Sequence, residues 1–295
     1  MHLKPGHLKL RPLKPRHLTK NLRFILFVYL FSIEGILTLN HGVANEIKSA
    51  AKVFESHTKD TTLLELYTSE GCSSCPPAEH WFSQLTHDDR LWKQLFPIAF
   101  HVDYWDYLGW RDPFASPTFT LRQRKYERLN YIQQVATPGF VVSGKGWNGW
   151  FRRKPLPSYE LSQSIGHLKV RLLEDDVSIN YQLNDPTKSF FKSKSPKAHI
   201  AILGFDIVVP IDSGENSGLD FKHDFVVLAY QQTSLIQTDN EWRTHLKKPV
   251  PNMNFSHISS SKKPFHDSNS NKRAVVIWVS EGNDPKPMQV TGGWL

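Results

Sequence analysis

The sequence predicts an α/β domain followed by a smaller, mostly antiparallel β domain. Apolar strand-like runs alternate with helix-like segments through residues 61–168, and a Cys-x-x-Cys pair opens the first helical segment. Residues 169–295 instead show short strands separated by turn-rich segments. Because 39% of the 295 residues are hydrophobic, the chain can bury a core and is not expected to be disordered.

The basic excess of the chain is concentrated at its beginning. Residues 1–44 hold seven of the 36 Lys and Arg and one of the 28 Asp and Glu, so the net charge falls from +8 to +2 without them. This distribution removes the support for a nucleic-acid partner. A basic stretch, the apolar run 24–33 and small residues up to Ala44 form the pattern of a secretory signal peptide. An uncleaved N-terminal anchor is the alternative, and both predict an exported protein.

The first domain is expected to begin after a polar linker, residues 45–60. Strands are predicted over 61–68, 95–102 and 140–143, and helices over 72–85, 118–132 and 158–168. Pro76 and Pro77 are tolerated because they fall in the first turn of their helix. The basic residues of the second helix, which are Arg122, Arg124, Lys125 and Arg128, are expected to form a solvated face.

The second domain is expected to begin near residue 168, where the pattern changes. Residues 177–183 alternate apolar and polar side chains, which predicts a half-exposed antiparallel strand. Further strands are predicted over 198–209, 224–230 and 273–279. The Ser-, Asn- and Lys-rich residues 249–271 predict a loop.

Cys72 and Cys75 are the only cysteines, so any disulfide within the chain is the one between them. A Cys-x-x-Cys that follows a buried strand and opens a helix is typical of a thioredoxin-like redox site. Because a helix N-terminus stabilises a thiolate, we expect Cys72 to be the catalytic nucleophile and Cys75 to resolve the mixed disulfide. The alternatives are a structural disulfide and a copper or zinc site with His80, which lacks ligands at a standard spacing.

Thr137-Pro138 supplies a second signal, because in thioredoxin-like folds a cis proline precedes a strand and faces the cysteines. Pro138 is therefore expected in the catalytic site, with Thr137 binding the extended backbone of a partner. Asp103, Trp105 and Asp106 follow the second strand and are expected to bind substrate at the same edge of the sheet. The alternative is that these three residues belong to a packed aromatic loop, residues 103–115, whose carboxylates are exposed.

Four long segments carry a family resemblance: LELYTSEGCSSCPPAE (64–79), FHVDYWDYLGWRDPFASPTFTLRQRKY (100–126), TPGFVVSG (137–144) and SGENSGLDFKHDFVVL (213–228). With them the chain, from about residue 61 onward less the loop 249–271, resembles bacterial and plant proteins known only as a domain of unknown function. The resemblance implies a thioredoxin-like fold, often with a secretion signal, but no established reaction. Leu66 stands where working thioredoxins carry a buried acid, and the adjacent Glu65 is expected to point to the opposite face.

These observations together predict an exported, periplasmic thiol–disulfide oxidoreductase. It is expected to act on a protein thiol or disulfide partner without a cofactor or metal, and to meet a membrane only if its N-terminal segment stays uncleaved. One alternative is a non-catalytic binding protein with a permanent disulfide, in which Gly214-Glu215-Asn216 and the second domain carry the function. The other is a copper- or zinc-handling protein.

Overall fold

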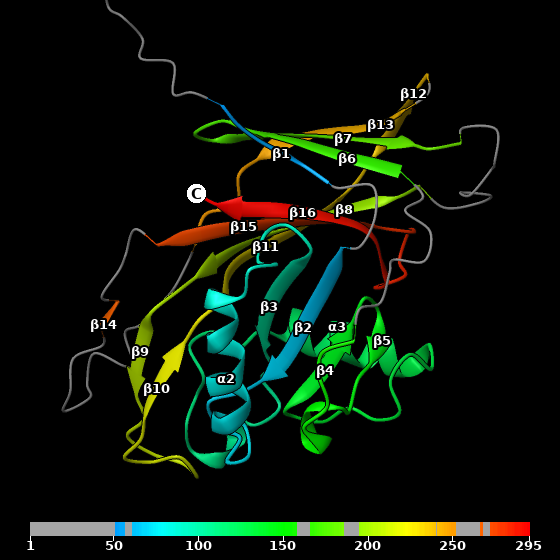
Figure 1. Cartoon of the computed structure of the whole chain (residues 1–295). Coiled ribbons are helices and arrows are strands. Elements are labelled where there is room, and N and C mark those ends of the chain that lie inside the picture. Colours follow the sequence, from blue (N-terminus) through cyan, green and yellow to red (C-terminus); the bar gives the residue numbers. More distant parts are fainter. Residues whose placement is uncertain are drawn as a thin grey trace, which may run out of the picture. The chain divides into compact units, whose positions relative to one another are not determined.

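Sheets predominate over helices in this mixed α/β chain (Figure 1). A computed structural model describes residues 51–56, 61–157, 166–185, 195–239, 241–251, 266–267 and 272–295. The expected signal peptide, parts of the linker 45–60 and most of the loop 249–271 lie outside the described residues. Among the helices that are described, none is long and apolar enough to cross a membrane.

An eight-stranded sheet runs in the order β16-β15-β8-β11-β3-β2-β4-β5. Its strands are β2 (Thr62–Thr68), β3 (Leu95–His101), β4 (Gly139–Val142), β5 (Lys145–Gly146), β8 (Lys197–Gly204), β11 (Val226–Ser234), β15 (Arg273–Ser280) and β16 (Pro287–Trp294). β2 and β3 are parallel, β4 is antiparallel to β2, and β5 is antiparallel to β4. Every residue of β2 and β3 is buried, as expected for parallel strands covered on both faces. The three strands predicted for the first half are confirmed.

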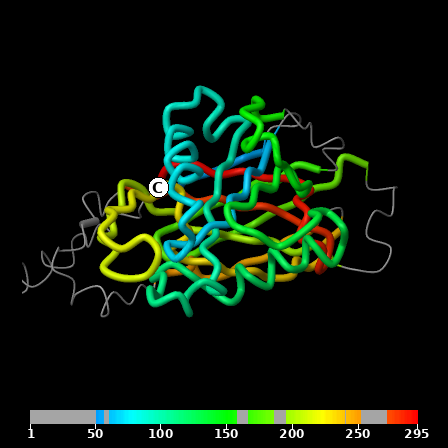
Figure 2. Tube along the Cα trace, turned by 90° about the horizontal axis from the view of Figure 1, so that it is seen from below, coloured from blue at the N-terminus to red at the C-terminus, as the bar shows by residue number. Residues whose placement is uncertain are grey.

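Two helices lie on opposite sides of β2, β3 and β4 (Figure 2). α2 (Pro76–Ser83) begins after Cys75, its N-cap, and not at Cys72 as predicted. The two prolines have no N–H group to donate to a helix carbonyl. Only the first turn of a helix needs no such donor, so the prolines fix where α2 begins. α3 (Pro117–Arg128) begins at Ser116, whose hydroxyl accepts a hydrogen bond from the N–H of Thr118 at 3.2 Å.

A five-stranded antiparallel sheet packs against the eight-stranded sheet (Figure 1). Its order is β1 (Lys52–Glu55), β6 (Gly166–Leu172), β7 (Asp176–Leu183), β13 (Glu241–Lys247) and β12 (Ile236–Thr238). Val170 and Ile179 from this sheet share a buried cluster with Ile200 and Ile277 of the large sheet. The alternating burial along β7 confirms the predicted half-exposed strand.

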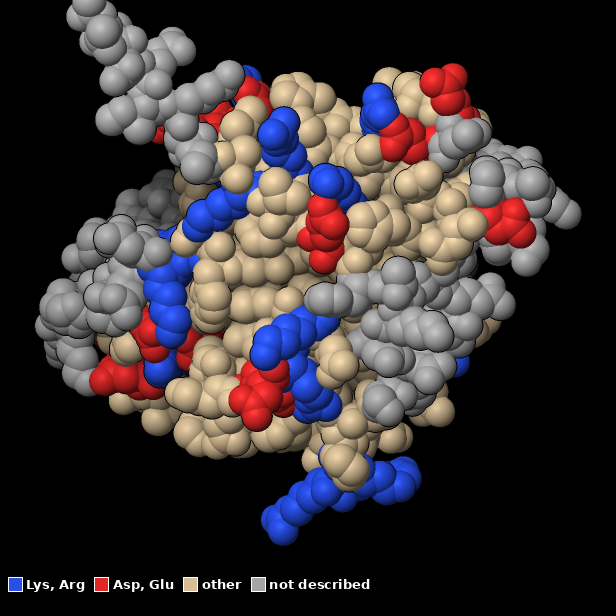
Figure 3. All heavy atoms as spheres, turned by 45° about the horizontal axis from the view of Figure 1, so that its top comes forward, with Lys and Arg blue, Asp and Glu red and all other residues tan. Residues whose placement is uncertain are grey.

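The outer face of the five-stranded sheet carries charges of both signs. Figure 3 shows Lys and Arg close to Asp and Glu across the part of this face that it displays. Lys169 pairs with Glu55 at 2.7 Å, and Lys247 pairs with Asp176 at 3.0 Å. Such exposed pairs add little stability, but they break up the basic surface that a polyanion would need.

Two predicted segments differ from the structure. Residues 166–168 begin strand β6 instead of ending a helix, and the rest of that predicted helix, 158–165, lies outside the described residues. The predicted strand 198–209 is two strands, because Asp206 between them has a left-handed φ of 55°. The second of these, β9 (Ile207–Pro210), lies between β10 (Asp220–His223) and β14 (His266–Asp267) in a three-stranded sheet.

The eight-stranded sheet contains strands from both sides of the domain boundary that is expected near residue 168. The two halves meet where β11 lies parallel to β3, with Val226 opposite Ala99. The N–H of Ala99 donates to the carbonyl oxygen of Phe225 at 2.9 Å. All described residues fall in one compact unit, Ser49–Leu295, so the second half completes the sheet that the first half begins.

A buried ion pair joins β2 to α3 and corrects the expectation that Arg122 lies on a solvated face. Arg122 is 8% exposed, and its Nε and Nη2 donate to the carboxylate of Glu65 at 2.8 and 2.9 Å. The hydroxyls of Tyr67 and Tyr126 donate to the same carboxylate at 2.7 and 2.6 Å. Nη2 of Arg122 also donates to the carbonyl oxygen of Pro285 at 3.0 Å. These hydrogen bonds offset the cost of burying the two charges.

Removing one partner of this pair should destabilise the fold strongly. Glu65→Leu or Arg122→Met leaves an uncompensated buried charge, at an expected cost of about 3–5 kcal/mol in the free energy of unfolding. The double variant should be more stable than either single variant, because neither charge is then left alone. Urea unfolding followed by circular dichroism measures all three. A double variant whose free energy of unfolding does not exceed that of the less stable single variant would contradict this account.

His199 on β8 is a second buried ionisable group, and it is held neutral. Its Nδ1 pairs with the hydroxyl of Tyr230 at 2.7 Å and its Nε2 with that of Ser280 at 2.8 Å. The imidazole stacks on the ring of Trp278, with 4.9 Å between centroids. Burial, assisted by the charge of Arg122, holds the pKa of His199 well below its usual value.

The neutral state of His199 should make stability depend on pH. The unfolded chain binds a proton at this side chain below about pH 6.5, while the folded chain does not. Its contribution to the free energy of unfolding should therefore fall as the pH drops below about 6.5, by up to about 1.4 kcal/mol per pH unit. Urea unfolding at pH 7 and pH 5 should show a smaller difference for His199→Gln than for the unchanged chain. Equal differences would mean that His199 titrates alike in both states.

Candidate active site

The disulfide between Cys72 and Cys75 lies directly after β2, in the turn that leads into α2. Cys72 is 4% exposed and Cys75 is fully buried. The turn is fixed by the N–H of Cys72, which donates to the carbonyl oxygen of Ser69 at 3.1 Å. A Cβ at Gly71 would lie 3.1 Å from the Cβ of Trp105, so glycine here lets the aromatic loop approach the cysteines closely.

The Thr137-Pro138 segment lies beside the cysteine loop, and its peptide bond is cis. The hydroxyl of Ser74 is 3.4 Å from Sγ of Cys72 and donates to the carbonyl oxygen of Thr137 at 3.5 Å. Nε1 of Trp105 donates to the hydroxyl of Thr137 at 2.7 Å. Contacts on Thr137 thus connect the disulfide loop and the aromatic loop to the residue that precedes Pro138.

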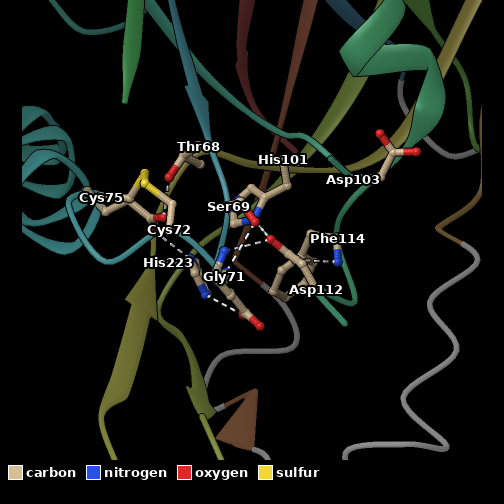
Figure 4. Close-up of polar contacts among 12 residues, drawn as sticks. Thr68, Ser69, Gly71, Cys72, Cys75, His101, Asp103, Asp112, Phe114 and His223 are labelled. Atoms are coloured by element: carbon tan, nitrogen blue, oxygen red, sulfur yellow. Dashed lines mark hydrogen bonds and ion pairs between the residues drawn. A yellow bond between two sulfur atoms is a disulfide. The ribbon is translucent and has the colours of Figure 1, made fainter. Parts of the chain in front are cut away.

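The other two predicted substrate-binding residues, Asp103 and Asp106, accept hydrogen bonds from α3 and from the loop that follows β3. The hydroxyl of Thr120 donates to Asp103 at 2.5 Å, and Figure 4 shows Asp103 well away from the disulfide. Asp106 accepts a hydrogen bond from the N–H of Asp112 at 3.3 Å, and partial burial raises its pKa to about 6. Both carboxylates therefore have partners within the fold, and their role in substrate binding stays a prediction.

A cluster of five buried ionisable side chains lies close to the disulfide (Figure 4). This buried cluster consists of Glu70, Glu79, His101, Asp112 and His223, each at most 7% exposed. The imidazole of His223 bridges two carboxylates, with Nδ1 2.6 Å from Glu79 and Nε2 2.8 Å from Glu70. Nδ1 of His101 lies 2.7 Å from Asp112, and the two imidazole centroids are 5.0 Å apart.

Neutral donors satisfy the remaining oxygens of the two glutamates. The hydroxyl of Thr68, which Figure 4 shows beside the disulfide, donates to Glu79 at 2.6 Å. Nε1 of Trp110 donates to Glu70 at 2.6 Å. Each carboxylate therefore has a hydrogen bond at both oxygens, which is the condition for burying it without a large penalty.

Hydrogen bonding is complete at the carboxylate of Asp112 but not at the imidazole of His101. Asp112 accepts hydrogen bonds from the backbone N–H groups of Glu70 and Phe114, both at 2.9 Å, in addition to its pairing with His101. Nε2 of His101 is buried and has no hydrogen-bond partner within the described part of the chain. Because buried polar atoms are nearly always paired, this nitrogen is a feature that needs an explanation.

The carboxyl groups and imidazoles shift one another's pKa values. Burial raises the pKa of Glu70 to about 7, and the charge of Asp112 adds to that rise. Burial also acts to raise the pKa of Glu79, but His223 outweighs it and the pKa is lowered overall. Burial opposes the positive charge on both imidazoles, yet Glu79 holds the pKa of His223 well above its usual value, and Asp112 raises that of His101. The positive charge of the cluster thus offsets its negative charge.

The buried cluster draws residues from both halves of the chain, and sequence reasoning missed it. Glu70 and His101 carried a usable signal, because each ends or follows a strand that is otherwise apolar. Asp112 and His223 carried no such signal, because they come close to His101 only when β10 and the aromatic loop fold back toward the end of β3. Asn216, from the segment that resembles a family motif, donates to the carbonyl oxygen of Glu70 at 2.7 Å and connects the second half to this turn.

The hydrogen bond from Asn216 should stabilise the turn at Glu70. Asn216 is buried and its neighbour Glu215 is exposed, so the two alanine variants form a matched pair. Asn216→Ala should lower the free energy of unfolding by about 1–3 kcal/mol, because the Glu70 carbonyl then stays buried without this partner. Glu215→Ala should change it by less than about 0.5 kcal/mol. Similar losses in both variants, measured by urea unfolding, would show that the segment acts by some other means.

Comparison with known proteins gives a family but no reaction. The family described as "Protein of unknown function (DUF1223)" matches residues 63–258. No curated protein matches the chain. Among solved structures, protein AGR_C_4864 from Agrobacterium tumefaciens is 20% identical, with a TM-score of 0.47 over 79% of this chain and 93% of that one. HBP35 of Porphyromonas gingivalis is 12% identical, with a TM-score of 0.49 over 81% of this chain and 76% of its own.

Proposed function

We propose that this chain, which belongs to the DUF1223 family, is a thiol–disulfide oxidoreductase whose redox pair is Cys72 and Cys75. The observation that carries the proposal is the position of the disulfide, between the end of β2 and the beginning of α2 and beside Thr137-Pro138. A helix N-terminus stabilises a thiolate through its positive partial charge, and in α2 this charge acts without N–H groups from the first two positions, which are prolines. A cysteine pair placed there is suited to exchange chemistry.

The surrounding elements support a thioredoxin-like arrangement. β3, β2, β4 and β5 lie in this order, with β3 parallel to β2 and each of the next two strands antiparallel to the one before it. One helix follows the cysteines, a second lies on the other side of the sheet, and Thr137-Pro138 precedes β4. Because such a fold also serves proteins without redox activity, the proposal depends on the chemistry of the cysteine pair.

The proposed reaction oxidises a dithiol in a partner protein. One partner thiolate attacks Sγ of Cys72, the bond to Cys75 breaks, and Cys75 leaves as a thiolate that takes up a proton. The second partner thiolate then attacks the partner sulfur of the mixed disulfide and releases Cys72. The partner ends as a disulfide and the cysteine pair as a dithiol, and the two protons lost by the partner balance the two gained. The same steps in reverse reduce a partner disulfide.

The partner is proposed to dock as an extended segment against Thr137 and Pro138, beside Trp105. Ser74 and Trp105 already hydrogen-bond to Thr137, which fixes the orientation of this surface relative to Cys72. The proposed place of action is outside the cytoplasm, in a bacterial periplasm. Disulfide exchange is sustained there by an oxidising environment.

Single cysteine variants should distinguish the two roles. Cys75→Ser leaves Cys72 without its resolving partner, so its thiolate should attack a model protein that carries an accessible disulfide and should accumulate as the mixed disulfide. Cys72→Ser should form far less of it, since Cys75 is fully buried. Non-reducing gels and mass spectrometry after acid quenching measure the adducts, and the double serine variant is the control. Equal trapping by both variants, or none by either, would contradict the proposed exchange.

A second candidate function is a binding protein with a permanent disulfide, and the burial of both cysteines favours it. The reduction potential of the pair separates the two candidates. Values between about −120 and −270 mV are those of catalytic thiol–disulfide proteins, whereas a value below about −300 mV is typical of structural disulfides. Equilibration in defined dithiol buffers with thiol counting by mass spectrometry gives this value.

A further inference from the structure

We propose that Glu79, His101 and His223 bind one divalent transition-metal ion of the zinc class inside the buried cluster. One ligand atom from each of the three side chains lies within 4.8 Å of the other two, and all three residues are buried. The site uses neither cysteine, and it is independent of the proposed exchange reaction. It would join α2, β3 and β10, which carry the three ligands.

The unpaired nitrogen of His101 is the first argument for this site. Its Nδ1 is engaged by Asp112 at 2.7 Å, which leaves Nε2 as the nitrogen available to a metal. Nε2 is buried and has no hydrogen-bond partner among the residues that the structure describes. A metal ion shared with Glu79 and His223 would occupy this nitrogen and remove the unpaired atom.

The carboxylates behind the imidazoles are the second argument. Histidine ligands of metals usually hydrogen-bond through their other nitrogen to a carboxylate, which sets the ring orientation. Asp112 has this relation to His101, and Glu70 has it to His223, whose Nε2 it meets at 2.8 Å. The nitrogen of His223 that faces Glu79 is Nδ1. Both imidazoles thus have an orienting carboxylate on one side and a ligand position on the other.

The charge of the buried cluster is the third argument. Three buried carboxyl groups surround two imidazoles, and no Lys or Arg is among their hydrogen-bonding partners in the described residues. With neutral imidazoles, a divalent cation would supply the positive charge that protons on the rings otherwise supply. The same arrangement of groups can therefore hold either protons or a metal ion.

The ligand set points to a transition metal. Two imidazole nitrogens and one carboxylate oxygen suit Zn²⁺ and similar ions, whereas Ca²⁺ and Mg²⁺ prefer sites made of oxygen alone. Tetrahedral ligands at about 2.0–2.1 Å from Zn²⁺ are about 3.3 Å apart. The contact of 2.6 Å between Nδ1 of His223 and Glu79 would have to open by about 0.7 Å as the ion replaces the shared proton.

The test measures Zn²⁺ binding to the full chain with its disulfide intact, so that no thiolate is available. The ion is offered to the folded protein and, because the ligands are buried, also during refolding from urea. After removal of loosely held metal, elemental analysis should find one Zn²⁺ per chain. X-ray absorption of the bound zinc should show imidazole and oxygen ligands and no sulfur. Less than stoichiometric zinc under both loading conditions, or sulfur ligands, would overturn the site.

Variants then assign the ligands, with affinities taken from competition against a chromophoric chelator. His101→Gln should abolish stoichiometric binding, and Asp112→Asn should weaken it about 10–100-fold by releasing the ring orientation. His199→Gln is the matched control, since that buried imidazole has partners at both nitrogens, and it should bind as the unchanged chain does. The double serine variant of the cysteines should also bind normally. Unchanged binding in His101→Gln, or loss in the cysteine variant, would refute the assignment whatever the outcome for thiol exchange.

Discussion

The position of β11 beside β3 is the constraint on which the rest of the structure depends. This contact makes the strands of the second half continuous with those of the first, so one sheet runs through both. His223 comes just before β11, and it therefore lies next to the end of β3, where His101 stands. The cysteine loop follows β2, the next strand along. The same pairing that completes the sheet also assembles the charged surroundings of the disulfide.

Two networks of buried charge follow from this arrangement, and both obey the same rule. In one, a guanidinium pairs with a carboxylate, and two phenols and a carbonyl group hydrogen-bond to this pair; in the other, imidazoles alternate with carboxylates. Burial of ions is tolerable where their polar atoms have partners, and Nε2 of His101 is the side-chain atom of these networks that has none among the described residues. The networks lie on β2 and β3 and at their ends, so the strands that lead to the disulfide loop are fixed by directional bonds as well as by apolar packing. A loop that must keep two sulfur atoms in a set relation gains from such a rigid base.

Sequence reasoning succeeded where a local pattern decides the structure. Mostly apolar runs identified β2 and β3, and alternation identified β7. It failed where distant contacts decide. Arg122 looks like a surface residue until Glu65 is placed across from it, and β16 was missed because Pro287, Gly292 and Gly293 weaken its strand signal. The cysteines and the Thr137-Pro138 segment were identified by their spacing, whereas the convergence of His101, Asp112 and His223 requires the tertiary fold.

The strands at the C-terminal end have a practical consequence for anyone who works with a part of this chain. The family match stops at residue 258, but β15 and β16 follow it, and β15 pairs with β8 along its whole length. A fragment cut at the limits of the match would leave the long apolar edge of β8 bare, and bare edges of this kind recruit other chains into aggregates. Insolubility of such a fragment would say nothing about the activity of the protein. The piece to express is therefore longer than the piece that family membership defines.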